Sequence, residues 1–206
     1  MFGASSSSAT VTIENKTTDP ALVTLRRNIY LTVMSSMGYE ECAHKLCQLP
    51  IAGHEVEVAT MIVDCCAQDR TYTVFYGLLA AKFCQKAASY RALFEGSFAR
   101  TYQGIDGQDS AKIRNVANLF AHLLKTNALS WDVLSCVVLS VDATTASSRI
   151  FVKILFQEIS GFVGIPALSH RLFDPAFVAK CPGLHTDFAM AFWKSIGLGQ
   201  IIPSTE

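Results

Sequence analysis

The chain has 206 residues, of which 50% are hydrophobic and 17% are charged. A chain of this length and apolar content can bury a large core, which excludes disorder as its main state. Seventeen basic residues balance seventeen acidic ones. This balance argues against indiscriminate nucleic-acid binding, because proteins that neutralise many phosphates carry a basic excess.

The first 18 residues are rich in serine and threonine and have no hydrophobic period, which predicts a flexible tail. They lack the basic and apolar regions of a secretory signal. No apolar run in the sequence approaches the ~20 residues of a membrane-spanning helix. Seven cysteines, spaced as on helix faces rather than as a disulfide framework, favour reduced thiols in a cytosolic or nuclear compartment. We therefore expect an intracellular chain with no membrane segment.

From Asp19 onward the hydrophobic period is helical almost everywhere. Pro20 directly after Asp19 is typical of a capped first helical turn. The expected helices, in chain order, are 20–38, 39–49, 54–68, 72–86, 88–102, 110–125, 131–138, 149–162, 167–173 and 187–196. Helical neighbours on both sides argue against a strand at 137–141. The pattern predicts an all-α fold of stacked antiparallel helical hairpins, arranged as a bundle or as a curved solenoid.

Two of these helices have contrasting patterns. In 110–125 the apolar residues form a single stripe, and Asn115, Asn118 and His122 fall on the opposite side, where we expect them at the surface. The helix 149–162 is apolar nearly all round, which is typical of a central buried helix. The dense run of threonine and serine at 144–148 predicts the cap that starts it.

No group of residues has the spacing of an active site or a metal site. Cys42, His44 and Cys47 are close in sequence, but positions 42 and 47 of a helix point about 140° apart. Cys65 and Cys66 are adjacent, a spacing that common zinc sites do not use. Buried apolar cysteines explain the pattern better. No glycine-rich nucleophile turn or phosphate loop accompanies them, so we expect no catalytic residue, no cofactor and no metal ion.

Polar residues near conspicuous turns are the candidate protein-binding residues, because arginine in particular forms forked hydrogen bonds and stacks on aromatic rings at interfaces. They are Arg26, Arg27, Arg70, Asn115, Arg149 and Lys153. The alternative for the cations is ordinary solvated surface charge. Ser147 and Ser148, before Arg149 and Lys153, either cradle an anion at a helix N-terminus or simply cap the helix.

Several strings in the chain are more specific than these patterns. In order, they are LRRxIYL at 25–31, EECAHKL at 40–46, DCCAQxRTY at 64–72, FxGLLA at 75–80, RNVAxxFAHLL at 114–124, SSRIFVKI at 147–154 and SIGLG at 195–199. From about Leu25 to Gly199 they resemble the C-terminal MA3 domain of the CWC22 family of pre-mRNA-splicing factors. The segment 172–186 departs from that family's pattern.

The resemblance implies a HEAT-like, MA3-like α-solenoid of helical hairpins at 19–200, between the tail 1–18 and a C-terminal tail at 201–206. It implies a non-catalytic protein-docking scaffold of the activated and catalytic spliceosome in the nucleus, with a link to exon-junction-complex deposition. The partners it implies are core U5 components and other splicing factors. In that family the DEAD-box helicase of the exon junction complex is held by a middle domain that precedes the MA3 domain.

That middle domain is absent from this sequence. The chain is therefore expected to be either a fragment or a separate protein that meets a middle-domain chain or the helicase. Two other functions remain open. One is an RNA-contacting module, which the zero net charge limits to local contact. The other is an adaptor for a DEAD-box helicase, as in MA3-containing translation factors.

Overall fold

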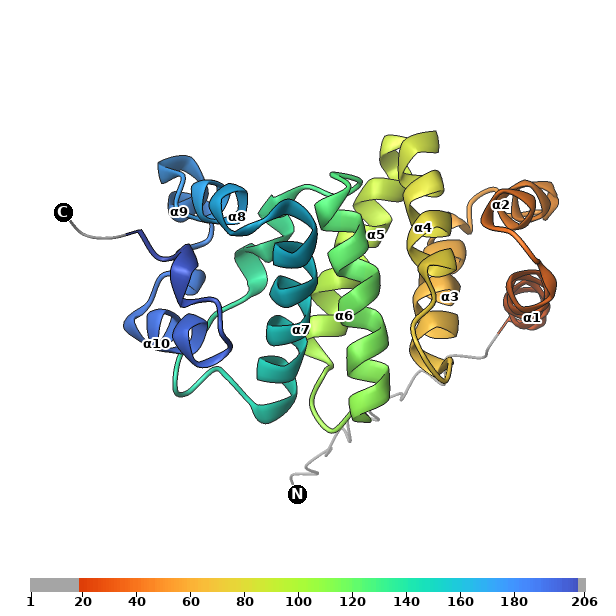
Figure 1. The fold of residues 1–206 in the computed structure, drawn as a ribbon. Coiled ribbons are helices and arrows are strands. Elements are labelled where there is room, and N and C mark those ends of the chain that lie inside the picture. Colours follow the sequence, from red (N-terminus) through yellow and green to blue (C-terminus); the bar gives the residue numbers. More distant parts are fainter. Residues whose placement is uncertain (1–18, 204–206) are drawn as a thin grey trace, which may run out of the picture.

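The computed structural model describes residues 19–203, which form ten α-helices and three 3₁₀-helices and contain no strand (Figure 1). The elements are α1 Pro20–Ser35, α2 Tyr39–Gln48, α3 Glu55–Gln68, α4 Val74–Lys86, α5 Ala88–Gln103, α6 Ser110–Lys125, η1 Trp131–Cys136, α7 Ala146–Val163, α8 Ile165–Leu172, α9 Pro175–Lys180, η2 Pro182–Leu184, α10 Asp187–Ser195 and η3 Gly199–Ile201. The all-α prediction is confirmed. The tail predicted at 1–18 lies outside the described residues.

The helices stand in a row of stacked hairpins (Figure 1). Helices α1 and α2 end the row on one side and pack on α3 and α4, respectively. Both α3 and α4 pack against α6, and α6 packs against α7. The short helices α8, α9 and α10 close the other side (Figure 1). This arrangement is an α-solenoid, one of the two arrangements that the helical pattern allows and the one that the resemblance predicts.

Helix starts follow the capping residues in the sequence. The Asp19 carboxylate accepts the amide N–H of Ala21 at 3.0 Å at the start of α1. Helix α7 begins with a capping box, in which Thr145 and Ser148 exchange side chain-to-backbone hydrogen bonds. These bonds satisfy amide groups that a helix N-terminus leaves unpaired, and they confirm the predicted caps.

Helix α6 lies inside the array, and the polar side that was expected at its surface is mostly buried. Asn115 is 1% exposed and His122 is 7% exposed, whereas Asn118 keeps partial exposure. The prediction that all three lie at the surface is therefore wrong for Asn115 and His122. The reason is that α6 has neighbours on two sides, with α3 and α4 on one and α7 on the other.

Helix α7 is buried on one side only, so the prediction of a helix buried all round is wrong. Phe151 and Phe156 face the core, while Lys153 and Phe162 are exposed. Phe98 of α5 lies between the helices, because its ring centroid is 5.1 Å from that of Phe120 in α6 and 5.8 Å from that of Phe151. Within residues 19–203, no single helix is long and apolar enough to cross a membrane.

The C-terminal part contains three elements that the sequence patterns did not predict, α9, η2 and η3. The η2 segment holds residues 137–141 in place, because Gly183 O accepts the amide N–H of Leu139 at 2.9 Å. The folded unit also continues beyond residue 200. Ile201 is fully buried, and its carbonyl oxygen accepts the Ser169 hydroxyl at 2.6 Å. The tail expected at 201–206 therefore begins too early, and its last residues, 204–206, lie outside the described range.

Candidate protein-docking surface

The turn between α3 and α4 presents Arg70 to solvent. Asp69 organises this turn: its carboxylate accepts the amide N–H of Arg70 at 2.7 Å and the Tyr76 hydroxyl at 3.0 Å. Burial and the bond to Asp69 both raise the pKa of Tyr76, so the phenol stays protonated and remains a donor. Arg70 therefore projects from a turn whose backbone is fixed.

Asn115 holds the same turn from beneath. Its Nδ2 donates to the carbonyl oxygen of Asp69 at 2.8 Å. The backbone carbonyl oxygen of Asn115 lies 3.5 Å from the Cys66 thiol, which is a weak donor. Among the sequence-predicted residues, the structure thus joins Arg70 and Asn115 through Asp69. Asn115 supports the turn from the interior and is not available as a surface contact residue.

The starts of α6 and α7 share an edge with this turn. Asn115 lies in the second turn of α6, and the Thr145 hydroxyl that caps α7 bonds to the Asp106 carboxylate in the loop before α6. Figure 1 shows the three segments along the lower edge of the array. Five exposed cations lie on these segments, and we call them the basic edge: Arg70, Lys112, Arg114, Arg149 and Lys153.

Sequence reasoning left Lys112 and Arg114 out of this set, although they flank Ile113, the first residue of the apolar stripe of α6. The capping box confirms the simpler interpretation of 144–148, a helix cap. The anion cradle is disfavoured, because a carboxylate, Asp106, already bonds to the cap residue Thr145.

Arg26 and Arg27, adjacent on α1, have different environments. The Arg26 Nε lies 2.5 Å from Oε2 of Glu57, a residue of α3 that is only 7% exposed. The hydrogen bond to Glu57 is the main reason that the pKa of Arg26 is raised. Arg27 is exposed, and no ion pair involves it within residues 19–203. Arg26 thus ties α1 to α3, which removes it from the set of unengaged docking cations.

A polar groove that the sequence patterns did not reveal, with a volume of about 410 Å³, lies between α5, the loop after α6, η1, α8 and α9. It begins where α6 ends in a Schellman motif, with the Ala128 amide bonded to Leu123 O and Asn127 in the left-handed region at φ 55°. The Asn127 side-chain oxygen accepts Arg171 Nη1 at 2.8 Å. The guanidinium carbon of Arg171 lies 4.1 Å from the ring centroid of Trp131, a cation–π distance.

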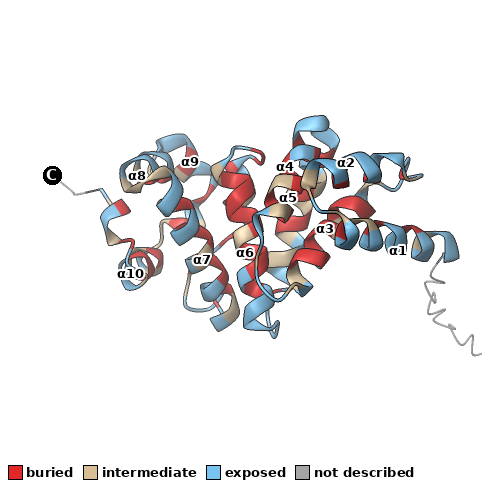
Figure 2. Cartoon of the chain, turned by 45° about the vertical axis from the view of Figure 1, so that its right-hand side comes forward, coloured by how far each residue is buried: buried red, intermediate tan, exposed pale blue. Residues whose placement is uncertain are grey.

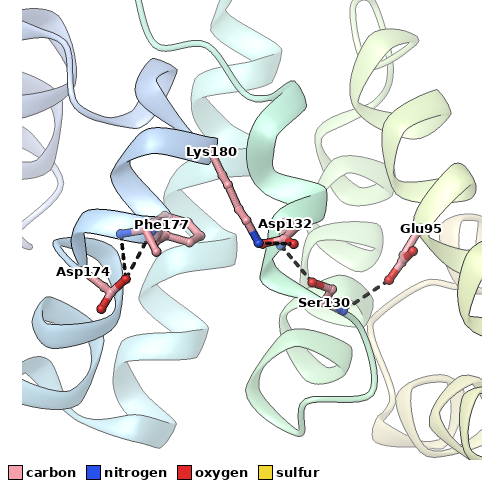
Figure 3. A network of polar contacts seen from close by, with 7 residues as sticks. Glu95, Ser130, Asp132, Asp174, Phe177 and Lys180 are labelled. Atoms are coloured by element: carbon pink, nitrogen blue, oxygen red, sulfur yellow. Dashed lines mark hydrogen bonds and ion pairs between the residues drawn. The ribbon is translucent and has the colours of Figure 1, made fainter.

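One ion pair, between Lys180 and Asp132, lines the groove (Figure 3). Lys180 Nζ lies 2.7 Å from Asp132 Oδ2, and both side chains are more than half exposed. The Glu95 carboxylate accepts the amide N–H of Ser130 at 3.3 Å, which links α5 to the start of η1 (Figure 3). Exposed pairs of this kind contribute little to stability, so these groups can exchange their intramolecular bonds for bonds to a bound protein. Two strings in the sequence mark this region: Asn-Ala-Leu-Ser directly after α6 and Asp-Pro at the start of α9.

The buried cysteines Cys65, Cys84 and Cys181 are not reactive thiols. Burial raises the pKa of Cys65 to about 11, that of Cys84 to about 12 and that of Cys181 to about 11. Thiols in such surroundings stay protonated at neutral pH and are poor nucleophiles. Within the described part of the chain, no three His, Cys, Asp or Glu side chains converge in a way that would hold a metal ion.

Comparison with known proteins gives one family match and a consistent set of relatives. The family model for the MA3 domain matches residues 25–130, from α1 to the loop after α6. The chain is 48% identical over 190 residues to the Pre-mRNA-splicing factor CWC22 homolog of Drosophila melanogaster, which covers 88% of the chain and 14% of that protein. The human CWC22 homolog is 48% identical over 197 residues, 92% of the chain and 22% of that protein.

A third relative is the pre-mRNA-splicing factor cwf22 of Schizosaccharomyces pombe. It is 42% identical over 192 residues, 89% of the chain and 22% of that protein. The chain therefore spans between 14% and 22% of the length of these relatives. Their similarity extends through α7 and most of the C-terminal helices, beyond the part that the family model covers. The chain belongs to the MA3 domain family, and over about nine tenths of its length it is similar to CWC22 pre-mRNA-splicing factors.

Proposed function

We propose that this chain is a non-catalytic protein-docking module that acts in pre-mRNA splicing in the nucleus. The observation that carries the proposal is the 48% identity, over 92% of the chain, to a human protein named as a pre-mRNA-splicing factor. Its partners are spliceosomal proteins, core U5 components among them. The finer part of the proposal is a link to exon-junction-complex deposition.

The arrangement of the surface supports docking rather than chemistry. The cations of the basic edge stand on helix starts and on a turn that hydrogen bonds fix in place. A backbone that is already ordered loses little conformational entropy when a partner binds, which favours affinity. We propose the basic edge as the contact surface, with Arg70, Arg149 and Lys153 as contact residues.

Affinity purification from nuclear extract with the tagged chain, read by mass spectrometry, tests the assignment. The expected result is enrichment of spliceosomal proteins that survives ribonuclease treatment. Loss of these proteins after ribonuclease would favour the RNA-contacting module. Recovery of translation factors with their DEAD-box helicase, without splicing proteins, would overturn the splicing assignment. Recovery of the exon-junction-complex helicase tests the proposed link to exon-junction-complex deposition.

Charge reversal tests the contact surface. In the double variant Arg70→Glu/Arg149→Glu, recovery of spliceosomal proteins is expected to fall, because a reversed charge opposite a complementary surface is repelled. The matched control is Lys82→Glu/Lys86→Glu, which makes the same charge change at the other end of α4. Both variants change exposed groups and are expected to fold normally by circular dichroism. Equal losses in both variants, or none in either, would place the contact surface elsewhere.

A further inference from the structure

Helix α1 ends the array, and its outer side is unusually apolar. Leu25, Ile29 and Val33 are buried toward the rest of the array. The opposite side carries four large apolar residues that are between 42% and 53% exposed, Val23, Tyr30, Leu31 and Met34, and Met37, 97% exposed, lies in the turn after the helix. Figure 2 shows α1 at the end of the molecule with exposed residues along its outer side. We call these five residues the outer face of α1.

The outer face has the geometry of a helix-packing seam. At 100° per residue, Val23, Tyr30 and Met34 fall within about 40° of arc, and Arg27 lies in the same stripe. Terminal repeats of a solenoid normally carry a polar outer surface, because nothing in the chain covers them. A contiguous apolar stripe at that position marks an interaction site instead. Methionine adapts to varied partners, and tyrosine is a frequent interface anchor.

The charges on α1 indicate which kind of helix fits this seam. Its sequence contains Arg26 and Arg27 and no carboxylate. The Arg26 guanidinium is engaged by Glu57, whereas Arg27 lies inside the apolar stripe without an ion pair within residues 19–203. A second copy of α1 would bring two more arginines and no acidic group. A partner helix with a carboxylate beside its apolar residues would pair with Arg27.

We propose that the outer face of α1 binds an amphipathic helix of a partner protein, one with a carboxylate beside its apolar stripe. This inference rests on the proposed docking function and adds a second surface, at the end of the array and apart from the basic edge. The 16-residue length of α1 matches a partner helix of about four turns. The apolar residues provide most of the binding energy, and Arg27 provides preference for an acidic partner.

Two synthetic helices test the surface directly. Each is about 16 residues long, stapled because short isolated helices are marginal in water, and carries a leucine stripe flanked by either glutamate or lysine. Fluorescence anisotropy is expected to show the glutamate helix binding about fivefold more tightly, a typical size for one exposed charge pair. Arg27→Glu is expected to reverse the preference. Equal binding of both helices, or binding of neither, would overturn the proposal.

Matched variants distinguish binding at the outer face of α1 from nonspecific hydrophobic binding at other surfaces. Val23→Asp/Met34→Asp is expected to weaken binding of both helices by about tenfold or more, because both substitutions place a charge in the seam. The control Val74→Asp/Val141→Asp alters two valines elsewhere that are at least as exposed and is expected to bind as the unaltered chain does. Unchanged binding in the α1 variant would overturn the proposal. A dimer in light scattering that the α1 variant dissociates would assign the face to a second copy.

A photocrosslinking amino acid at position 34 connects the surface to its natural partner. In nuclear extract, the crosslinked peptide is expected to come from a spliceosomal protein and to have an apolar helical period with an adjacent Asp or Glu. If the tagged chain recovers spliceosomal proteins but position 34 crosslinks to none of them, the α1 inference fails and the proposed function stands. If no spliceosomal protein is recovered at all, the proposed function fails, and the synthetic helices still decide whether the face binds helices.

Discussion

Asn115 and Asp69 are 46 positions apart in sequence, yet Asn115 Nδ2 donates to the carbonyl oxygen of Asp69 at 2.8 Å. The bond joins α6 to the turn between α3 and α4, and it satisfies an acceptor that no backbone amide reaches within the described residues. A buried acceptor that loses its donor costs about 1–3 kcal/mol of stability. The exposed Arg70 is therefore positioned from the interior of the array.

We expect Asn115→Ala to lower the free energy of unfolding by about 1–3 kcal/mol, because Asp69 O loses its donor. Urea unfolding followed by circular dichroism measures it. Asn118→Ala is the matched control: Asn118 lies on the same helix, but its amide only donates to Arg114 O within α6, so the change should be within about 0.5 kcal/mol. Equal effects of the two substitutions would contradict the assigned role of Asn115.

The neighbouring arginines of α1 are expected to differ in stability effect. Arg26→Met leaves the buried Glu57 carboxylate without its ion-pair partner and should cost about 1–2 kcal/mol, reduced from the full buried-pair value because the Arg26 side chain is 46% exposed. Arg27→Met should stay within about 0.5 kcal/mol. Denaturant midpoints give both values. The double variant Arg26→Met/Glu57→Gln should recover part of the loss, and its failure to do so would show that packing, not the ion pair, carries the effect.

Gly77 is expected to tolerate no side chain. A Cβ there would lie 2.5 Å from His122 Cγ and 2.7 Å from Tyr72 Oη. Gly77→Ala should therefore destabilise the fold by about 1–3 kcal/mol, the usual range for overpacking. Gly161→Ala in α7 is the control, because nothing lies within 4 Å of its Cβ position. Alanine in a helix is favoured over glycine by about 0.5–1 kcal/mol, so differential scanning calorimetry should show Tm falling for the first variant and rising or holding for the second.

Stability is expected to fall on acidification below about pH 6.5. Burial lowers the pKa of both His122 and His185 in the folded state, whereas the unfolded chain keeps values near 6.5. Below that pH the unfolded state binds more protons than the folded state. The free energy of unfolding therefore rises as the pH rises through this window and decreases as the pH falls. Urea midpoints between pH 5 and pH 8 measure the slope.

Substitution of one histidine shows how much of that pH dependence it causes. His122→Gln is expected to flatten the pH dependence below about pH 6.5, whatever its effect on stability at pH 8. A slope that His122→Gln does not alter would mean that other groups, such as carboxylates, cause the acid sensitivity.

The sequence by itself determined the long helices, most of their boundaries and the family. Helix α6 matches its predicted range at both ends, because Asp109 caps one end and the apolar period stops at the other. Capping residues and hydrophobic periodicity are local properties of the sequence. They can be recognised without knowing which other helices pack around an element. The same locality explains why Arg27, Arg70, Arg149 and Lys153 were correctly expected to be exposed.

Only the tertiary structure decided which helix is central. Helix α6 has one apolar stripe yet is enclosed on two sides, and this encloses Asn115 and His122. Helix α7 is apolar nearly all round yet leaves Phe162 exposed. Periodicity records which side chains are apolar, whereas burial depends on how many elements pack around a helix. A buried amide is tolerated wherever a distant backbone group supplies its partner, as Asp69 does for Asn115, and that partner is set by the fold rather than by the spacing of residues along the chain.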